Sequence, residues 1–213
     1  MDFLDPKIEQ YTLQNCEPES ELLYELNRQT HLQILQPRML SGHLQGRILS
    51  SYSKALIPNN VLEIGTYTGY SALCMAEGLK KDGIIHTIDI NEELTSFTQS
   101  FLNKSKFNNQ IKLHVGNALD IIPTLKLEWD LVFIDADKEN YSNYFDLVID
   151  RVRSGGWIIA DNVLWSGKVL KPTDRNDHET AALKAFNQKV HQDPRVTNLL
   201  LPVRDGMMIL IKK

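Results

Sequence analysis

The spacing of apolar residues changes along the chain, from a helical period near the N-terminus to short continuous runs after about residue 58. Apolar residues recur every three to four positions in ESELLYELNRQTHLQIL and in LQGRILSSYSKAL. In the second segment Leu44, Ile48, Tyr52 and Leu56 share one helical face. Residues 1 to about 58 are therefore predicted to form helices.

Strand and helix patterns alternate through the rest of the chain. The predicted strands are NNVLEIG, GIIHTIDI, IKLHVG, DLVFID and GGWIIAD, and the helices between and after them are YSALCMAEGLKK, NEELTSFTQSFLNKS, NYFDLVIDRVR and HETAALKAFNQKVHQ. In the third helix Phe145, Val148, Ile149 and Val152 are expected on one side. This alternation predicts a parallel sheet with helices on both faces, and the continuous apolar runs LVFI and WIIA fit strands that are buried on both sides.

The C-terminus adds a different signal. VTNLLLPV and MMILIKK flank RDG, which predicts a hairpin and therefore one antiparallel strand in the sheet. We expect a single α/β domain over residues 1–213, with a mostly parallel seven-stranded sheet. Residues 1–58 would form a helical extension within it, either a cap over the site or a dimer arm.

Composition narrows the class of protein. The 213 residues carry a net charge of -4, which argues mildly against a protein whose main task is to grip nucleic acid. Cys16 and Cys74 have no CxxC spacing and are expected to be free thiols, with Cys74 buried in a helix. Neither a leader segment nor an apolar run of about 20 residues is visible, so the expected location is the cytoplasm.

A glycine turn follows the first predicted strand, in VLEIGTYTGYS. Gly65 and Gly69 allow a tight turn, but Tyr67 stands where a dinucleotide-binding turn has its second glycine. A diphosphate would be crowded there, which disfavours NAD. Glu63 and Asp89 instead suit a cationic ligand with a ribose, because an acid at the end of the second strand hydrogen-bonds ribose hydroxyls. The pattern favours S-adenosylmethionine, although such turns are also common as purely structural elements.

Acidic residues end two other strands. Asp135 follows LVFI, and Asp161 and Asn162 follow WIIA. Ligands of open parallel sheets bind beyond the carboxyl ends of the strands, and two carboxylates with an amide oxygen suit Mg²⁺, Ca²⁺ or Mn²⁺. The alternative is that each aspartate caps the next helix.

Two nearby side chains have open interpretations. Lys138 is either a solvated surface lysine or a base beside the metal. Trp165 begins a segment expected to form a loop beside the metal, where its indole would either stack on an aromatic substrate or serve packing. The loop containing Pro172, Asp174 and Asn176 is expected to be an irregular lid.

Four segments together resemble the cation-dependent O-methyltransferases, the family of catechol and caffeoyl-coenzyme A O-methyltransferases, in its small bacterial form. They are LEIGTYTGYSALCMA, DLVFIDADKENYSNYFD, GGWIIADNVLWSGKV and LLPVRDGMMILIKK. The resemblance runs from about Met39 to the C-terminus and implies the Rossmann-like class I methyltransferase fold and a homodimer.

The resemblance also implies roles by position. Residues implied to line the S-adenosylmethionine site are Met39, Leu40, Glu63, Gly65, Thr66, Ser71, Asp89, Ala118, Asp135 and Asp137. It implies metal binding by Asp135, Asp161 and Asn162, and matches Lys138 to the catalytic base. Trp165 and Ser166 would contact the substrate, and Gly46 falls where the family has a glycine near the cofactor. Leu40 and Ser166 depart from the plant members, which have threonine and asparagine there.

These observations predict a metal-dependent O-methyltransferase that acts on catechol-like phenols, with Asp135 and Lys138 in the catalytic set. Two alternatives stay open: methylation of a hydroxylated tRNA wobble uridine, and a binding protein that kept the fold without catalysis. The arginines and histidine near the predicted cleft, Arg38, His43 and Arg47, would suit an anionic substrate or a solvated helix face.

Overall fold

The N-terminal quarter of the chain is helical, as predicted. The computed structural model describes residues 5–213. Helices α1 (Pro6–Gln14), α2 (Glu21–Gln33) and α3 (Gly42–Leu56) are joined through the short 3-10 helix η1 (Pro37–Met39). Ser20 caps α2 by accepting from the Leu23 amide. The expectation for residues 1–4 lies outside the described residues.

The rest of the chain alternates strands and helices around one sheet. The strands are β1 (Asn60–Ile64), β2 (Ile84–Asp89), β3 (Ile111–Val115), β4 (Trp129–Ile134), β5 (Val152–Ala160), β6 (Val196–Leu201) and β7 (Met207–Lys212). Their order is β3-β2-β1-β4-β5-β7-β6, and only β7 runs antiparallel to its neighbours. The predicted seven-stranded sheet and terminal hairpin are confirmed.

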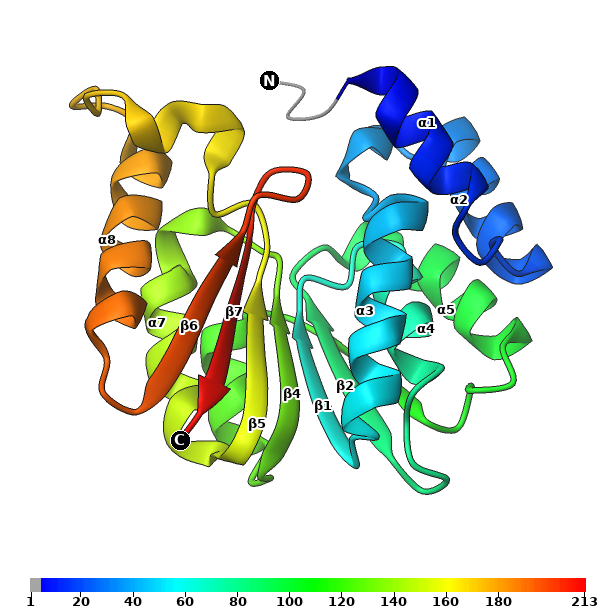
Figure 1. Cartoon of the computed structure of the whole chain (residues 1–213). Helices are drawn as coiled ribbons and strands as arrows, with labels where there is room; N and C mark the ends of the chain where they lie inside the picture. Colours follow the sequence, from blue (N-terminus) through cyan, green and yellow to red (C-terminus); the bar gives the residue numbers. More distant parts are fainter. Residues whose placement is uncertain (1–4) are drawn as a thin grey trace.

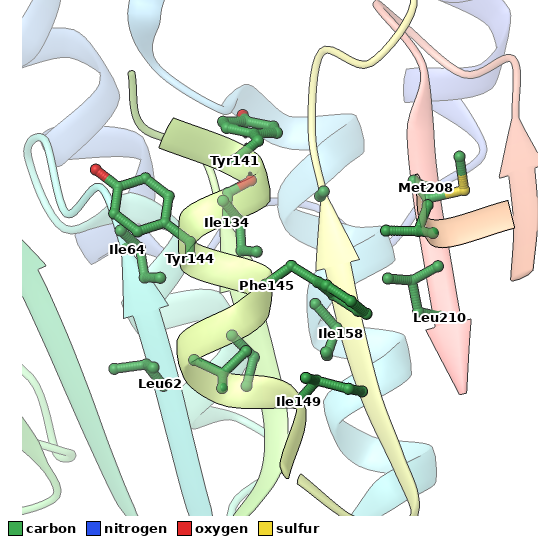
Figure 2. Close-up of a cluster of buried hydrophobic side chains, with 14 of the residues drawn as sticks. Leu62, Ile64, Ile134, Tyr141, Tyr144, Phe145, Ile149, Ile158, Met208 and Leu210 are labelled. Carbon is green, nitrogen blue, oxygen red and sulfur yellow. Dashed lines mark hydrogen bonds between the residues drawn. The ribbon is translucent and has the colours of Figure 1, made fainter. Parts of the chain in front are cut away.

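Helices cover both faces of the sheet (Figure 1). On one face lie α6 (Ala118–Ile121), α7 (Tyr141–Val148) and α8 (His178–Gln192), and on the other lie α2, α3, α4 (Tyr70–Ala76) and α5 (Thr95–Lys104). Figure 2 shows the first of these cores, where Phe145 and Ile149 lie among strand residues such as Leu62 and Ile158. Cys74 is fully buried in α4, as expected.

Several predicted helices end earlier in the structure. The segment YSALCMAEGLKK forms α4 only over Tyr70–Ala76 and not as far as Lys81. The helix around NYFDLVIDRVR ends early: α7 stops at Val148, the 3-10 helix η5 (Ile149–Arg151) follows, and Val152 begins β5. Val152 pairs with Trp129 of β4, so its burial comes from sheet pairing rather than from a helix face. Helix α2 likewise ends at Gln33, before the last two residues of the predicted segment.

The buried face of α3 also differs from the apolar stripe. The four stripe residues are only partly buried, whereas the fully buried positions of α3 are Gln45, Gly46, Leu49, Ser50 and Ser53. Small side chains let α3 approach α4 closely: a Cβ on Gly46 would lie 2.7 Å from the Cys74 Sγ. Gly46 therefore packs against Cys74 and Tyr70 of α4.

None of the helices between residues 5 and 213 has the length and apolar character that a bilayer crossing requires.

Candidate active site

The acids at the strand ends are brought together by the register of the sheet. Ile134 of β4 is paired with Ala160 of β5, so Asp135 and Asp161 follow at adjacent strand ends. The Asp161 amide donates to the Ile134 carbonyl at 3.0 Å, and the Asp135 amide donates to the Ile64 carbonyl at 2.8 Å. Neither aspartate caps a helix through its side chain, so the capping alternative is wrong.

A cleft of about 1480 Å³ opens above these strand ends. Of the predicted site residues, all but Glu63 and Gly46 line it: Met39, Leu40, Gly65, Thr66, Ser71, Asp89, Ala118, Asp135, Asp137, Lys138, Asp161, Asn162, Trp165 and Ser166. One wall is the segment 33–41 after α2, and the opposite wall is the start of η6 (Trp165–Leu170). In Figure 1 both walls lie at the end of the sheet where the parallel strands terminate.

The glycine turn lies against the strand that carries Asp135. Gly65 has a φ of +104°, and a Cβ there would lie 1.8 Å from the Asp135 carbonyl oxygen, so no side chain fits. Asp89 fixes the turn by accepting from the Tyr67 amide at 2.6 Å. The Tyr67 side chain reaches across to the Gln36 carbonyl and ties the turn to the N-terminal wall. Two predicted sites, the nucleotide turn and the acidic cluster, are therefore direct neighbours.

Glu63 lies beneath the turn rather than on the cleft surface. Its side chain is fully buried, Oε2 accepts from the Thr87 hydroxyl at 2.5 Å, and Oε1 has no hydrogen-bond partner among the described residues. Burial raises the pKa of Glu63 to about 8. Glu63 is therefore protonated at neutral pH in the ligand-free protein.

Lys138 lies inside the acidic cluster. It is 7% exposed, and its Nζ donates to Asp135 Oδ1 at 3.2 Å, Asn162 Oδ1 at 2.9 Å and the Tyr141 hydroxyl at 2.7 Å. The interpretation of Lys138 as a solvated surface residue is wrong. Its ammonium occupies the position between two oxygens predicted to hold a cation.

Asp161 has partners that the sequence pattern did not indicate. Its Oδ2 accepts from Gln45 Nε2 at 2.8 Å, and Gln45 in turn accepts from Arg204. Burial and the Asp135 carboxylate raise the pKa of Asp161. The Tyr141 hydroxyl donates to the Asp161 backbone carbonyl at 3.0 Å, and burial keeps the pKa of this phenol high.

The loop after β5 has an unusual backbone. Asn162, Trp165 and Ser166 all have positive φ, at 59°, 47° and 51°. The Asp205 carboxylate accepts from the Ser166 amide, and the Leu164 amide donates to the Asp205 carbonyl at 2.9 Å. The turn between β6 and β7 thus supports the loop that carries the predicted metal and substrate residues.

The three basic side chains of the N-terminal region do not form one group: one lies on the cleft, and the other two have partners elsewhere in the chain. Arg38 lines the cleft. Arg47 is instead paired with Glu77 at 2.8 Å, and the His43 ring contacts the Glu17 carbonyl at 2.6 Å.

The donor set fits a hard divalent cation. Within residues 5–213 no group of three or more His, Cys, Asp and Glu side chains is placed to hold a metal, so a site built on Asp135 and Asp161 would need an amide oxygen as its third protein ligand. Asn162 offers one beside Asp135, and Asp161 Oδ1 is buried with no hydrogen-bond partner in the described chain. A buried acceptor without a donor costs free energy unless a cation or a donor satisfies it.

Known proteins are similar in sequence to most of this chain. The family model of the O-methyltransferases matches residues 13–213. The chain is 35% identical to the caffeoyl-CoA O-methyltransferase of Medicago sativa over 176 residues, which cover 78% of this chain and 71% of the relative. A caffeoyl-CoA O-methyltransferase of Mesembryanthemum crystallinum is 36% identical over 176 residues, 78% of this chain and 69% of the relative.

Solved structures agree with the fold. The O-methyltransferase TomG from Streptomyces achromogenes, in complex with SAM, superposes with a TM-score of 0.90 at 27% identity, covering 97% of this chain and 96% of that one. An O-methyltransferase from Bacillus cereus in complex with SAH gives 0.89 at 28% identity, covering 97% of both chains. The sheet order, the family match and the relatives lead to one conclusion: the chain belongs to the O-methyltransferase family.

Proposed function

We propose that this protein transfers the methyl group of S-adenosylmethionine to a hydroxyl of a catechol-like acceptor, and that the reaction depends on a divalent cation. The observation that carries the proposal is the meeting of two groups of residues in one cleft. The glycine turn at Gly65 lies against the backbone of Asp135. The Lys138 ammonium donates hydrogen bonds to both Asp135 and Asn162.

The donor side is proposed to be the end of the cleft around the turn. Asp89 lies at the carboxyl end of β2, where an acid can accept from ribose hydroxyls. Thr66, Ser71, Ala118 and Asp137 line the same region, with Met39 and Leu40 on the facing wall. The methyl group of this donor is already activated by its sulfonium, so the protein has mainly to align the acceptor and to remove its proton.

The acceptor side is proposed to be the acidic cluster. Asp135, Asp161 and Asn162 would hold the cation through hard oxygen donors. When bound, Mg²⁺ or a similar ion supplies Lewis acidity, which lowers the pKa of a hydroxyl that touches it. An isolated phenol with a pKa of about 10 is ionised at neutral pH to only about one part in a thousand, a deficit of roughly 4 kcal/mol.

Lys138 is proposed to accept the hydroxyl proton at Nζ, acting as the neutral amine once a bound cation replaces it between Asp135 and Asn162. Its nitrogen already contacts Asp135 and Asn162, so it lies beside the oxygens that would orient the acceptor. Trp165 is proposed to pack against the acceptor ring, because it forms a cleft wall and its ring centroid lies 5.8 Å from Lys138 Nζ.

The test is methyl transfer from labelled S-adenosylmethionine to a catechol, with EDTA and then with excess Mg²⁺. We expect activity to vanish in EDTA and to return with Mg²⁺. Asp161→Asn should be inactive under both conditions, and Asp82→Asn, a change of an exposed acid, should behave like wild type. Full activity in EDTA would remove the cation from the reaction.

The substrate can be identified by testing a panel of candidate methyl acceptors in the same assay. It should include caffeoyl esters and undermodified tRNA beside catechols, since tRNA methylation is the competing enzymatic hypothesis. If only tRNA is methylated, and if the affinity of the protein for tRNA falls steeply as the salt concentration rises, tRNA would replace the phenol as the proposed acceptor.

We also propose that the protein forms a homodimer. Helices α1 and α2 expose large apolar side chains, Tyr11 at 69% and Tyr24 at 62%. Light scattering after gel filtration should give twice the mass of one chain, and a monomer at micromolar concentration would refute this.

A further inference from the structure

Gln45 joins the N-terminal helices to the acidic cluster. It lies in α3, its side chain is 1% exposed, and its Nε2 donates to Asp161 Oδ2 at 2.8 Å. Arg204, in the turn between β6 and β7, donates from Nη1 to Gln45 Oε1 at 2.5 Å. Three segments far apart in sequence therefore meet in one chain of hydrogen bonds.

The two neighbours of Gln45 determine which way its amide faces. A carboxylate such as that of Asp161 only accepts, whereas the guanidinium of Arg204 only donates. If the Gln45 amide were flipped, its oxygen would face the carboxylate and its NH₂ would face the guanidinium. Both hydrogen bonds would then be lost, so Arg204 fixes the orientation in which Gln45 donates to Asp161.

This arrangement leaves one oxygen of Asp161 for a ligand. Oδ2 is taken by Gln45, while Oδ1 is buried with no hydrogen-bond partner among the described residues. The backbone of Asp161 is held separately, because its carbonyl accepts from the Tyr141 hydroxyl at 3.0 Å. Tyr141 therefore fixes the main chain at this position, and Gln45 fixes the rotation of the carboxylate.

We propose that Gln45 is a positioning residue for the cation site: it holds the Asp161 carboxylate with Oδ1 directed to the ligand, and Arg204 keeps Gln45 in the donating orientation. The inference rests on the proposed function, because it assigns these two residues to the cation that Asp161 is proposed to bind. Partners of this kind, one step removed from the metal, typically change its affinity by about 10- to 100-fold when removed.

The experiment measures Mn²⁺ binding without turnover, from the electron paramagnetic resonance signal of the free ion. Gln45→Leu keeps the volume of the side chain and removes its amide. We expect its Mn²⁺ Kd to rise by about 10- to 100-fold. Binding of S-adenosylhomocysteine, followed by calorimetry, should stay within about twofold of wild type, because Asp161 belongs to the proposed acceptor side of the cleft.

Arg204→Ala is the second variant, and it should fold because Arg204 is exposed. We expect its Mn²⁺ Kd to rise roughly fivefold, the scale of the net contribution of one typical intramolecular hydrogen bond. Simple electrostatics predicts the opposite sign, since removal of a positive charge near the site would tighten cation binding. Arg175→Ala, at an exposed arginine of the loop before α8, is the matched control and should leave Kd unchanged.

The double variant completes the test. If Arg204 acts through Gln45, then Arg204→Ala should add no weakening once Gln45→Leu is present. Unchanged Mn²⁺ affinity in Gln45→Leu, or tighter binding in Arg204→Ala, would overturn the positioning role and leave the proposed function standing. Absence of Mn²⁺ binding in the wild-type protein would overturn both.

Discussion

Glu63 should make the ligand-free protein less stable as the pH rises through neutrality. Its carboxyl is fully buried, and burial raises its pKa to about 8, against 4.5 for a glutamate in the unfolded chain. Between these two pKa values the folded state holds a proton that the unfolded state has released. The free energy of unfolding therefore falls as the pH rises from about 4.5 to about 8, and this contribution is constant outside that window.

The size of the effect follows from the slope of one proton. Each pH unit inside the window costs about 1.4 kcal/mol, so the step from pH 5.5 to pH 7.5 costs roughly 3 kcal/mol. Glu63→Gln removes the ionisable group and keeps a side chain of the same shape. The free energy of unfolding of the variant, measured relative to that of wild type, should therefore rise by about 3 kcal/mol from pH 5.5 to pH 7.5.

The assay is urea unfolding of both proteins at half-unit pH intervals from 5.5 to 8.5, without donor or divalent metal. The quantity compared is the difference between the variant and wild type, which cancels titration shared by both, including that of His86, whose pKa burial lowers to about 4. Glu128→Gln, at an exposed position, is the matched control and should show no such difference. Parallel pH profiles for wild type and Glu63→Gln would refute the conclusion that the buried carboxyl is protonated.

Three further changes test other parts of the structure. In urea unfolding, Gly65→Ala should have a free energy of unfolding at least about 3 kcal/mol below that of Gly155→Ala. Both glycines have positive φ, but a Cβ on residue 65 would lie 1.8 Å from the Asp135 carbonyl oxygen, whereas a Cβ on residue 155 would meet only Arg153, at 3.4 Å. Equal loss in the two variants would contradict the close strand approach. Lys138→Met should lower the stability of the metal-free protein by about 2–4 kcal/mol, since it removes the buried ammonium that pairs with Asp135 and donates to Asn162. Mg²⁺ should restore most of this loss in thermal melts, and a melt that Mg²⁺ leaves unchanged would contradict the cation site. Phe186→Ala should cost about 3–5 kcal/mol in urea unfolding because its ring is fully buried between α8 and α7, and a loss below about 1 kcal/mol would show that this core is loosely packed.

The convergence of Asp135, Asp161 and Asn162 could be predicted from sequence because it depends on two local facts. Each residue follows a continuous apolar run, and parallel strands end at the same edge of a sheet. The turn at Gly65 was visible for a similar reason, since glycine spacing marks where the backbone has to bend.

Gln45 and Arg204 could not be found in the same way. They lie 116 residues and 43 residues from Asp161 in sequence, and their contact depends on how α3 and the last hairpin pack. Apolar spacing also points to the wrong face of α3, because polar and small residues form its buried side. Lys138 was ambiguous for the same reason: its burial depends on Asn162, an acceptor from the end of the neighbouring strand, as well as on Asp135 of its own segment.

The proposed cation ligands and the walls around them come from different kinds of structure. Asp135 and Asp161 continue directly from hydrogen-bonded strands, whereas Trp165, Ser166 and the segment 33–41 belong to connections outside the sheet. Replacing those connections leaves the strand register unchanged. A mutant library aimed at new acceptors can therefore be confined to residues 33–38 and 165–170, so that the strand ends and the proposed donor residues Met39 and Leu40 stay unchanged.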